Sequence, residues 1–455
     1  MRLNDLRVWL TKQFHRLFSN ELVRRIIKNS SYLFGTTGVA AAASMLQGIL
    51  AARLLGAAGF GILGAITLFS SVINNLASFR MGELVVKYVG FYTEQADPQT
   101  AAATFKLAAL VETAASIVAF GLVVILAPVG AALFTKDPQT APLFVLYGLV
   151  LLANLISESS TGLLQIFDRF GRIASLGILQ SLVTLGLIAI VFAAGGGLTG
   201  VLAAYLVGKL TGALGLSIVA LIEAQRRWGS GWWKTPLRPL RPKLGEMARF
   251  AVSTNISASI SLFTKDSELL WVSWLRGPTE AGYYKLALAL ANMVQMPVET
   301  LPQATYPELS RQVARDDWRS VRHILQQGSR LAAAYSLAAT LFLVIFGKSL
   351  ISLLYSPEFL PSYPALLILL VGLLVANSFY WRRIALLALG RADFPAKVNA
   401  ALALVKVVGT LIFVPRFGYL ASAALLSAFY WAGSFINVAK VRSLISQKQA
   451  KEGLG

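Results

Sequence analysis

Long apolar stretches joined by short polar connections run through almost the whole chain. A helix needs about 20 apolar residues to cross the hydrocarbon core of a bilayer. By this length criterion the sequence predicts twelve membrane-spanning helices, at residues 31–55, 60–82, 105–128, 143–167, 173–194, 198–222, 249–274, 279–306, 326–353, 362–389, 395–415 and 417–440. The predicted fold class is therefore an all-α membrane protein.

The composition supports a membrane location. Hydrophobic residues make up 56% of the chain and charged residues 14%. Soluble domains carry roughly 25% charged residues. A chain with so few charges lacks the polar side chains to cover itself in water, so we expect part of its surface to face lipid.

Lysine and arginine are distributed unevenly between the two predicted sides of the membrane. Positively charged connections stay in the cytoplasm. With a cytoplasmic N-terminus, thirty Lys and Arg residues lie on cytoplasmic segments and six lie inside the spans. The outer side holds five, Arg53, Lys136, Arg276, Lys348 and Arg416. This asymmetry predicts a multi-pass protein of the cell inner (plasma) membrane with both termini in the cytoplasm. It also explains the net charge of +20 without a nucleic-acid partner.

Three basic segments lie outside the predicted spans on the cytoplasmic side. Residues 1–30 are typical of an amphipathic helix at the membrane surface. Residues 223–248 form a basic linker, and residues 441–455 form a cytoplasmic tail. Tryptophan is enriched at membrane interfaces, and the linker contains Trp228, Trp232 and Trp233.

The chain repeats itself weakly at an offset of 221 residues. At this offset Gly56, Gly61 and Gly197 correspond to Gly277, Gly282 and Gly418. The third, fourth and fifth predicted spans fall on the ninth, tenth and eleventh. The repeat predicts two six-helix bundles, 31–222 and 249–440, which enter the membrane in the same orientation. Parallel repeats of this kind enclose a central cavity in transporters and alternate access by rocking one half against the other.

Eleven charged residues lie inside the predicted spans. A charged side chain in hydrocarbon costs on the order of 3 kcal/mol or more, so such residues face a partner or water. Six are basic: Lys209, Lys265, Lys285, Arg382, Arg383 and Lys406. Five are acidic: Glu112, Glu158, Asp266, Glu268 and Glu299. We expect the cavity between the bundles to be polar and hydrated.

The seventh predicted span carries three of these charges. Lys265 and Glu268 are three residues apart and share a helix face. Asp266 is turned about 100° away from Lys265. Two interpretations stay open. Either Lys265 and Glu268 neutralise each other, or Lys265 meets an anionic substrate while Asp266 or Glu268 binds a proton or a sodium ion.

The other basic residues also allow two interpretations. Lys209 and Lys406 have no acidic neighbour within one helical turn. They either pair across helices or form a site for anions. A guanidinium matches the oxygens of a phosphate, so Arg382 and Arg383 suit a phosphorylated substrate, unless their helix ends early at the cytoplasmic interface.

Pro297 and Pro302 interrupt the hydrogen bonding of the eighth span and predict a bent or broken helix. Glu299 lies between them and has either a coupling role or none. The candidate substrate-binding residues are therefore Lys209, Lys265, Lys285, Arg382, Arg383 and Lys406. The candidate ion-coupling residues are Asp266, Glu268 and Glu299.

The sequence gives no reason to expect a cofactor, a metal or a catalytic site. It has no cysteine and two histidines, the usual ligands of zinc and haem. The predicted outer connections are all short, so none is long enough for an enzyme domain. We therefore expect a protein that is not an enzyme.

Three motifs resemble a known family. They are AARLLGAAGFGILG at 51–64, KDSELLWVSWLRGPTEAGYYKLALALA at 265–291 and MPVETLPQATYPELSR at 296–311. They are similar to the polysaccharide-biosynthesis and O-antigen flippase branch of the multidrug/oligosaccharidyl-lipid/polysaccharide exporter superfamily. The resemblance implies a V-shaped pair of six-helix bundles around a cationic cavity, and it places the family's aspartate at Asp266. The related lipid II flippases have two further helices, which are not predicted here.

The resemblance implies transport of a lipid-linked oligosaccharide. The protein would turn a polyprenyl-diphosphate-linked glycan from the inner to the outer leaflet for assembly of a surface polysaccharide, such as the O-antigen of lipopolysaccharide. Its partners would be this substrate, membrane lipids and polysaccharide-assembly proteins. One alternative is an ion-coupled multidrug exporter of the same superfamily. Another, from a different class, is a membrane-embedded glycan polymerase or ligase.

Overall fold

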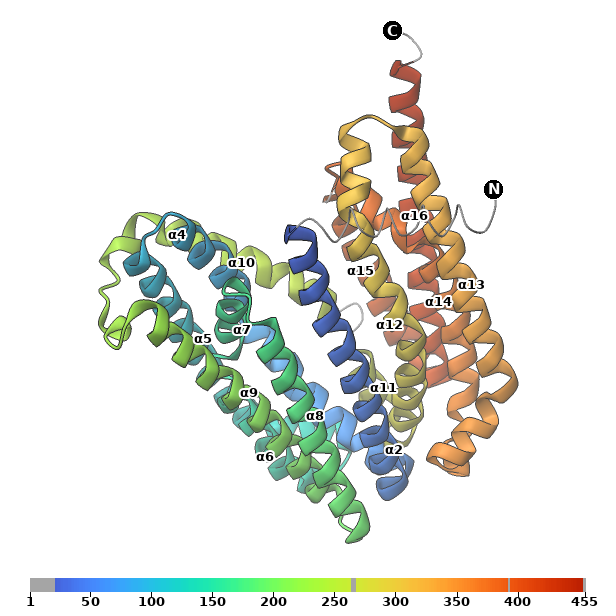
Figure 1. Cartoon of the computed structure of the whole chain (residues 1–455). Helices are drawn as coiled ribbons and strands as arrows, with labels where there is room; N and C mark the ends of the chain where they lie inside the picture. Colours follow the sequence, from blue (N-terminus) through green and yellow to red (C-terminus); the bar gives the residue numbers. More distant parts are fainter. Residues whose placement is uncertain (1–20, 263–266, 392, 453–455) are drawn as a thin grey trace, which may run out of the picture. The chain divides into compact units, whose positions relative to one another are not determined.

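The computed structural model describes residues 21–262, 267–391 and 393–452 (Figure 1). These residues form helices joined by short turns, and the described part of the chain contains no strand. They group into two compact units.

The first unit comprises the described residues of Met1–Ala51, Leu76–Val124 and Val145–Ile256. Helix α8 packs on α9, and α7 packs on α3 and α9. Its elements are the first part of α2 (Glu21–Ala77), α3 (Met81–Leu84), η1 (Val85–Val89), α4 (Gly90–Glu94), most of α5 (Pro98–Gly130), α6 (Ala141–Ala153), α7 (Ser157–Ile166), α8 (Phe170–Ala193), α9 (Leu198–Trp228), η4 (Trp232–Lys234), η5 (Arg238–Lys243) and α10 (Leu244–Ser261).

The second unit comprises the described residues of Ala52–Asn75, Ile125–Phe144 and Ser257–Gly455. Helices α12, α13 and α16 pack on α14, and α15 packs on α16 (Figure 1). Besides parts of α2 and α5, its elements are η2 (Ala131–Thr135), η3 (Pro138–Thr140), α11 (Glu268–Arg276), α12 (Pro278–Ala314), α13 (Trp318–Leu350), η7 (Ile351–Tyr355), η8 (Pro357–Phe359), α14 (Ser362–Ala388), α15 (Asp393–Phe417) and α16 (Tyr419–Glu452).

The all-α membrane fold is confirmed. Within the described ranges, nine helices are long and apolar enough to cross a membrane. One of them, Gly38–Ala77 in α2, contains most of the first two predicted spans. The predicted spans 249–274 and 279–306 are not among the nine, although α10, α11 and α12 make their described residues helical. Large apolar side chains lie exposed on these helices, such as Ile125 at 72% and Ile345 at 67%. Exposed apolar surface of this kind is suited to lipid contact.

Two predicted spans have a different local structure from the one expected. Residues 31–55 and 60–82 were expected as separate helices, but α2 runs through both with a kink at Gly56. Residues 143–167 were expected as one helix, but the chain leaves the helix after Ala153 and begins α7 at Ser157.

Local backbone geometry supports the internal repeat. Gly56 has φ 65° and ψ −177°, and Gly277 has φ 93° and ψ 177°. Positive φ with extended ψ is open essentially only to glycine, so the two corresponding glycines make the same kind of kink. The π-helical turn η2 is followed by the 3₁₀ turn η3, and η7 is followed by η8 in the same way. Gly197 and Gly418 differ, because Gly197 has φ −98° and Gly418 has φ 66°.

The grouping into units does not follow the predicted division between residues 222 and 249. Segments 52–75 and 125–144, expected in the N-terminal bundle, belong to the same compact unit as the C-terminal helices. The assignment of 31–222 and 249–440 to two bundles, with 1–30, 223–248 and 441–455 outside them, stays a prediction.

Candidate functional site

A buried ion pair lies in the second unit. Lys406 on α15 pairs with Glu268 on α11, and the two residues are only 6% and 3% exposed. The hydroxyl of Tyr284 on α12 donates to the same carboxylate. Three helices therefore converge on one carboxyl group in an apolar setting. Opposite charges with a further hydrogen bond offset the cost of taking both ions out of water.

A small pocket opens beside this pair. Its lining residues are Glu268, Trp271, Lys406, Val407, Thr410 and Ser422. Ser422 is 2% exposed and Thr410 is 4% exposed, and the Thr410 hydroxyl donates to the Lys406 carbonyl at 2.9 Å. A carboxylate, an ammonium and two hydroxyls are thus gathered away from solvent. This set can exchange a proton or a small cation, but it offers no open surface for a sugar.

The pair decides one of the interpretations left open by the sequence. Lys406 pairs across helices rather than standing as an open anion ligand. The suggested pairing of Glu268 with Lys265 is not needed to neutralise Glu268, because Lys406 already does so. Lys265 and Asp266 lie outside the described residues. Among the predicted site residues that are described, Lys406 and Glu268 are the two brought into contact.

Lys285 on α12 is held differently. Its Nζ donates to the backbone carbonyl of Phe60 on α2 at 3.2 Å and lies 3.9 Å from the centroid of the Phe60 ring. Its alkyl chain covers Gly64, where a Cβ would meet the Lys285 Cδ at 2.8 Å. No carboxylate pairs with it within the part of the chain that the structure describes. Lys285 is therefore a partly buried cation supported by a carbonyl dipole and a ring face.

Arg382 on α14 is partly buried. Its Nε is buried and finds no hydrogen-bond partner among the described residues. A buried donor without a partner is costly, on the order of 1–3 kcal/mol. The helix continues to Ala388, so the expectation of an early helix end at this point is wrong. Arg382 is therefore a cation with an unused donor inside a span.

The remaining candidates are placed less completely. Lys209 lies on α9 in the first unit and is exposed. The backbones of Arg383 on α14 and Glu299 on α12 are described, but their side chains lie outside the described part. Helix α12 runs unbroken through Pro297 and Pro302, so the expectation of a broken helix is wrong at this point.

Sequence reasoning found Glu112 inside a span but missed its role. The Glu112 carboxylate on α5 accepts hydrogen bonds from the backbone N–H groups of Glu158 at 2.7 Å and Ser159 at 2.9 Å, and from the Ser159 hydroxyl at 2.6 Å. These groups form the first turn of α7. A negative charge at a helix N-terminus satisfies free N–H groups and the helix dipole. The stretch Ser157–Ser160 after an apolar run is the sequence signal for such a helix start.

The second unit also contains a set of contacts that we call the outer clasp, because its residues lie on the side predicted to face outward. The Arg53 guanidinium donates to the carbonyls of Leu353, of Leu354 at 2.8 Å and of Tyr355 at 3.2 Å, all at η7. Glu358 accepts from the backbone N–H of Ala57 at 2.8 Å. These contacts join residues 52–75 to the second repeat.

The opposite half of the clasp mirrors this arrangement. Lys136 after η2 donates to the carbonyl of Trp274 at 2.6 Å, and the Ser273 hydroxyl donates to the carbonyl of Phe134 at 2.5 Å. Trp274 is the repeat counterpart of Arg53 at the offset of 221. Each repeat therefore places its first helix hairpin against the π-helical turn of the other repeat.

Comparisons with known proteins agree with the fold. The profile of the family described as polysaccharide biosynthesis protein matches residues 26–313, and the MatE profile matches residues 260–412. The chain is 26% identical over 348 residues to the inner membrane protein YghQ of Escherichia coli (strain K12), covering 76% of this chain and 97% of that one.

Solved structures show the same fold at low sequence identity. A multidrug resistance MATE family transporter of the MOP superfamily, in an inward-facing conformation, has a TM-score of 0.74 at 15% identity, over 90% of this chain and 95% of that chain. The lipid II flippase MurJ, in an inward closed conformation, has a TM-score of 0.70 at 13% identity, over 91% and 87%.

Proposed function

The chain belongs to the polysaccharide biosynthesis protein family, and from this membership we propose that it turns a polyprenyl-diphosphate-linked oligosaccharide from the inner to the outer leaflet. The product would serve assembly of a surface polysaccharide, with the O-antigen of lipopolysaccharide as the example. The multi-pass membrane fold supports this proposal. The orientation with both termini in the cytoplasm is part of the proposal.

The chemistry of the cargo sets what the protein must supply. A diphosphate and several sugars have to cross about 30 Å of hydrocarbon, while the polyprenyl tail can stay in lipid. The diphosphate needs cations that are not already neutralised. Lys285 and Arg382 meet this requirement within the described residues, because neither has a carboxylate partner there. The unused Nε of Arg382 is the observation that carries the proposal, since a phosphate oxygen would satisfy it.

The Glu268–Lys406 pair suits ion coupling rather than cargo binding. A proton delivered to Glu268 would remove its charge and leave Lys406 without a counter-ion. The pair would then separate, and α11 and α15 would be free to move relative to each other. Asp266 and Glu299 remain proposed coupling residues on sequence grounds alone.

The outer clasp suggests where a transport cycle has to open. Its contacts hold segments 52–75 and 125–144 of the first repeat to the second repeat on the side predicted to face outward. A cargo released on that side requires the clasp to break. Alternating access of a duplicated transporter would therefore involve making and breaking these contacts.

Reconstitution tests the proposal directly. The purified protein is inserted into vesicles that carry a fluorescent polyprenyl-diphosphate-linked glycan, and glycan exposure on the opposite leaflet is followed with time. We expect flipping to depend on the protein and to slow in Lys285→Gln and Arg382→Gln, while Lys397→Gln, an exposed control on α15, leaves it unchanged. Equal rates in empty and protein-containing vesicles would overturn the proposal. Transport of cationic dyes instead of the glycan would assign the protein to drug export.

A further inference from the structure

The connection between α9 and α10, residues 229–243, is the most one-sidedly charged segment among the described connections. It carries Lys234, Arg238, Arg241 and Lys243 and no acidic residue. We call this segment the basic platform. It follows a membrane-spanning helix directly, and it lies on the side predicted to be cytoplasmic.

The platform has a fixed shape, because its apolar residues are anchored in the core of the first unit. The rings of Trp228 and Trp232 lie 5.9 Å and 5.4 Å from the ring of Phe105 on α5. Leu240 is fully buried in the same core. The Nζ of Lys106 donates to the carbonyl of Thr235 at 3.2 Å. A polar connection that served only to join two helices would not need these anchors.

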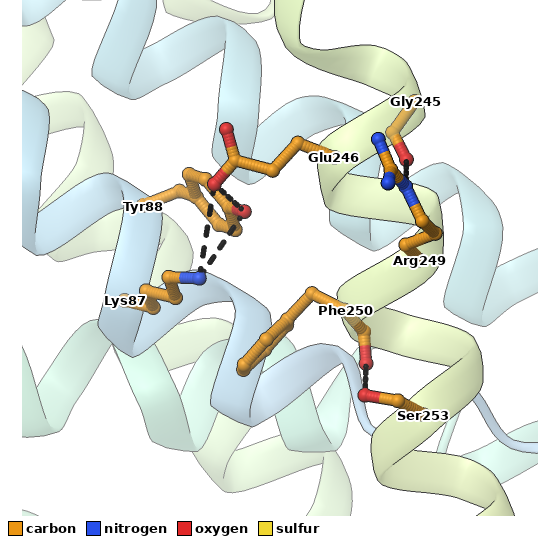
Figure 2. Close-up of polar contacts among 7 residues, drawn as sticks. All are labelled: Lys87, Tyr88, Gly245, Glu246, Arg249, Phe250 and Ser253. Atoms are coloured by element: carbon orange, nitrogen blue, oxygen red, sulfur yellow. Dashed lines mark hydrogen bonds and ion pairs between the residues drawn. The ribbon is translucent and has the colours of Figure 1, made fainter.

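The end of the platform is held by contacts around the start of α10. The Nζ of Lys243 lies 4.6 Å from the ring centroid of Phe91. Three residues later Glu246 accepts a hydrogen bond from the Tyr88 hydroxyl at 2.8 Å and pairs with Lys87 at 3.9 Å (Figure 2). Figure 2 shows Lys87 and Phe250 on either side of this contact. The acidic group nearest in sequence is therefore engaged with η1 and does not neutralise the platform.

The face that remains open combines an indole with cations. Trp233 is 56% exposed, and Lys234 lies 5.0 Å from its ring centroid. Arg238 and Arg241 are also exposed. None of these three cations is in an ion pair within the described residues. Exposed tryptophan prefers the headgroup region of a bilayer, and clustered Lys and Arg next to a span attract anionic lipids.

We propose that the basic platform binds anionic phospholipid headgroups of the adjacent leaflet. Trp233 inserts its indole at the level of the headgroups, while Lys234, Arg238 and Arg241 contact lipid phosphates. Because the platform is rigid, bound lipid would fix the depth of α9 and α10 in the membrane. This inference does not depend on which cargo the protein carries.

Brominated lipids test the contact in the intact protein. The full chain is placed in nanodiscs of phosphatidylcholine, or of phosphatidylcholine with phosphatidylglycerol, and one of the two lipids is brominated near its headgroup. The chain has nine tryptophans, so the signal of Trp233 is obtained as the difference between the wild type and Trp233→Phe. We expect this difference signal to be quenched more strongly by brominated phosphatidylglycerol than by brominated phosphatidylcholine at equal mole fraction.

Matched charge variants complete the test. The triple variant Lys234→Gln, Arg238→Gln, Arg241→Gln should lower the preference for phosphatidylglycerol by about fivefold for each charge removed. The control Arg315→Gln, Arg319→Gln, Lys448→Gln removes the same charge from exposed positions elsewhere and should retain the preference. Equal quenching by both lipids, or a preference that survives the platform variant, would overturn the proposal. Loss of the preference on addition of micromolar pyrophosphate would assign the face to a soluble diphosphate and would overturn it too.

Discussion

Gly61 on α2 and Gly282 on α12 pack backbone against backbone in the second unit. A Cβ at Gly61 would overlap the carbonyl oxygen of Pro278, and a Cβ at Gly282 would overlap the carbonyl oxygen of Ala57. Both pairs, 57 with 278 and 61 with 282, are related by the repeat offset of 221 residues. The contact is therefore reciprocal, as in a two-fold interface in which each copy offers the same surface.

Gly61→Ala should disrupt this contact. The added methyl group meets backbone rather than a flexible side chain, and overpacking of this kind costs about 1–3 kcal/mol. We expect a lower melting temperature in detergent and slower flipping in vesicles. Gly121→Ala is the matched control, because a Cβ at Gly121 meets nothing within 4 Å. If the two variants melt at the same temperature, the close approach of α2 and α12 is wrong.

The Glu268–Lys406 pair should show strong coupling in a double-mutant cycle. Lys406→Met leaves a buried carboxylate without its partner, and breaking a buried pair from one side costs about 3–5 kcal/mol. Replacing both partners, in Glu268→Gln with Lys406→Met, should recover most of the stability because no charge stays buried. Thermal unfolding of the four proteins measures the coupling.

The same cycle separates a structural role from ion coupling. If the pair couples transport to an ion, the stable double variant should flip cargo without a response to a proton or sodium gradient. A double variant that keeps its gradient response would restrict the pair to a structural role. Single variants whose losses of stability simply add up would contradict the ion pair itself.

The sequence predicted much of the fold because its signals are local. Apolar length placed the spans, and the hairpin glycines Gly56 and Gly277 stood out because few residues tolerate a positive φ. The partners of charged residues were beyond its reach. Lys406 and Glu268 are 138 residues apart, and which faces of α11 and α15 meet depends on tertiary packing. The helical spacing rule could suggest only a near neighbour, Lys265.

The same limit applies to the units and to Glu112. The rule of about 20 apolar residues treats each span as one straight helix, so it merged α6 with α7 and divided α2. Glu112 caps α7 from a different helix, 46 residues away, and no local pattern links the two. The clasp depends on contacts between the repeats, such as Arg53 with Leu354, that periodicity cannot place.

The outer clasp predicts a change in chemical accessibility. Ala57 is fully buried, and the chain has no natural cysteine. A single Ala57→Cys should therefore react slowly with a membrane-impermeant maleimide. Adding Arg53→Gln and Glu358→Gln removes the hydrogen bonds that hold this segment to η7 and η8. Each bond contributes about 1 kcal/mol, so the labelling rate should rise about fivefold for each substitution.

Lys348→Gln is the control for this experiment. Lys348 is exposed at the end of α13 on the same predicted side, and its Nζ lies near the ring of Tyr363 rather than the clasp. It should leave the labelling of Ala57→Cys unchanged. Labelling as fast in the otherwise unaltered chain as in the Arg53 and Glu358 variants would contradict a closed clasp.

Asp317 predicts a pH dependence of stability. It precedes α13 and accepts a hydrogen bond from the backbone N–H of Ser320 at 3.0 Å, which lowers the pKa of its carboxyl group. A lowered pKa in the folded state contributes stability above the unfolded pKa of about 3.9, and this contribution is lost as the pH falls through the folded value. Asp317→Ala should therefore melt roughly 2–4 °C lower at neutral pH.

The difference between wild type and Asp317→Ala should shrink as the pH falls below about 4. Thermal melts at a series of pH values measure it. Asp316→Ala is the neighbouring control, since its carboxyl group does not cap α13 among the described contacts. A difference that stays constant down to acidic pH would mean that the Asp317 carboxylate does not act as the cap.

Arg382 gives the sharpest test of cargo chemistry. If its unused Nε binds a phosphate oxygen, Arg382→Gln should raise the glycan concentration needed for half-maximal flipping by about tenfold, the value of one charged hydrogen bond. Arg382→Lys keeps the charge but loses the planar fork, so it should recover only part of the affinity. Arg391→Gln is the control, because Arg391 is exposed and pairs with Asp393. If Arg382→Gln flips the glycan like the wild type, the phosphate binds elsewhere; if instead it loses a diphosphate-linked glycan but not an uncharged lipid analogue, the cation acts on the phosphate itself.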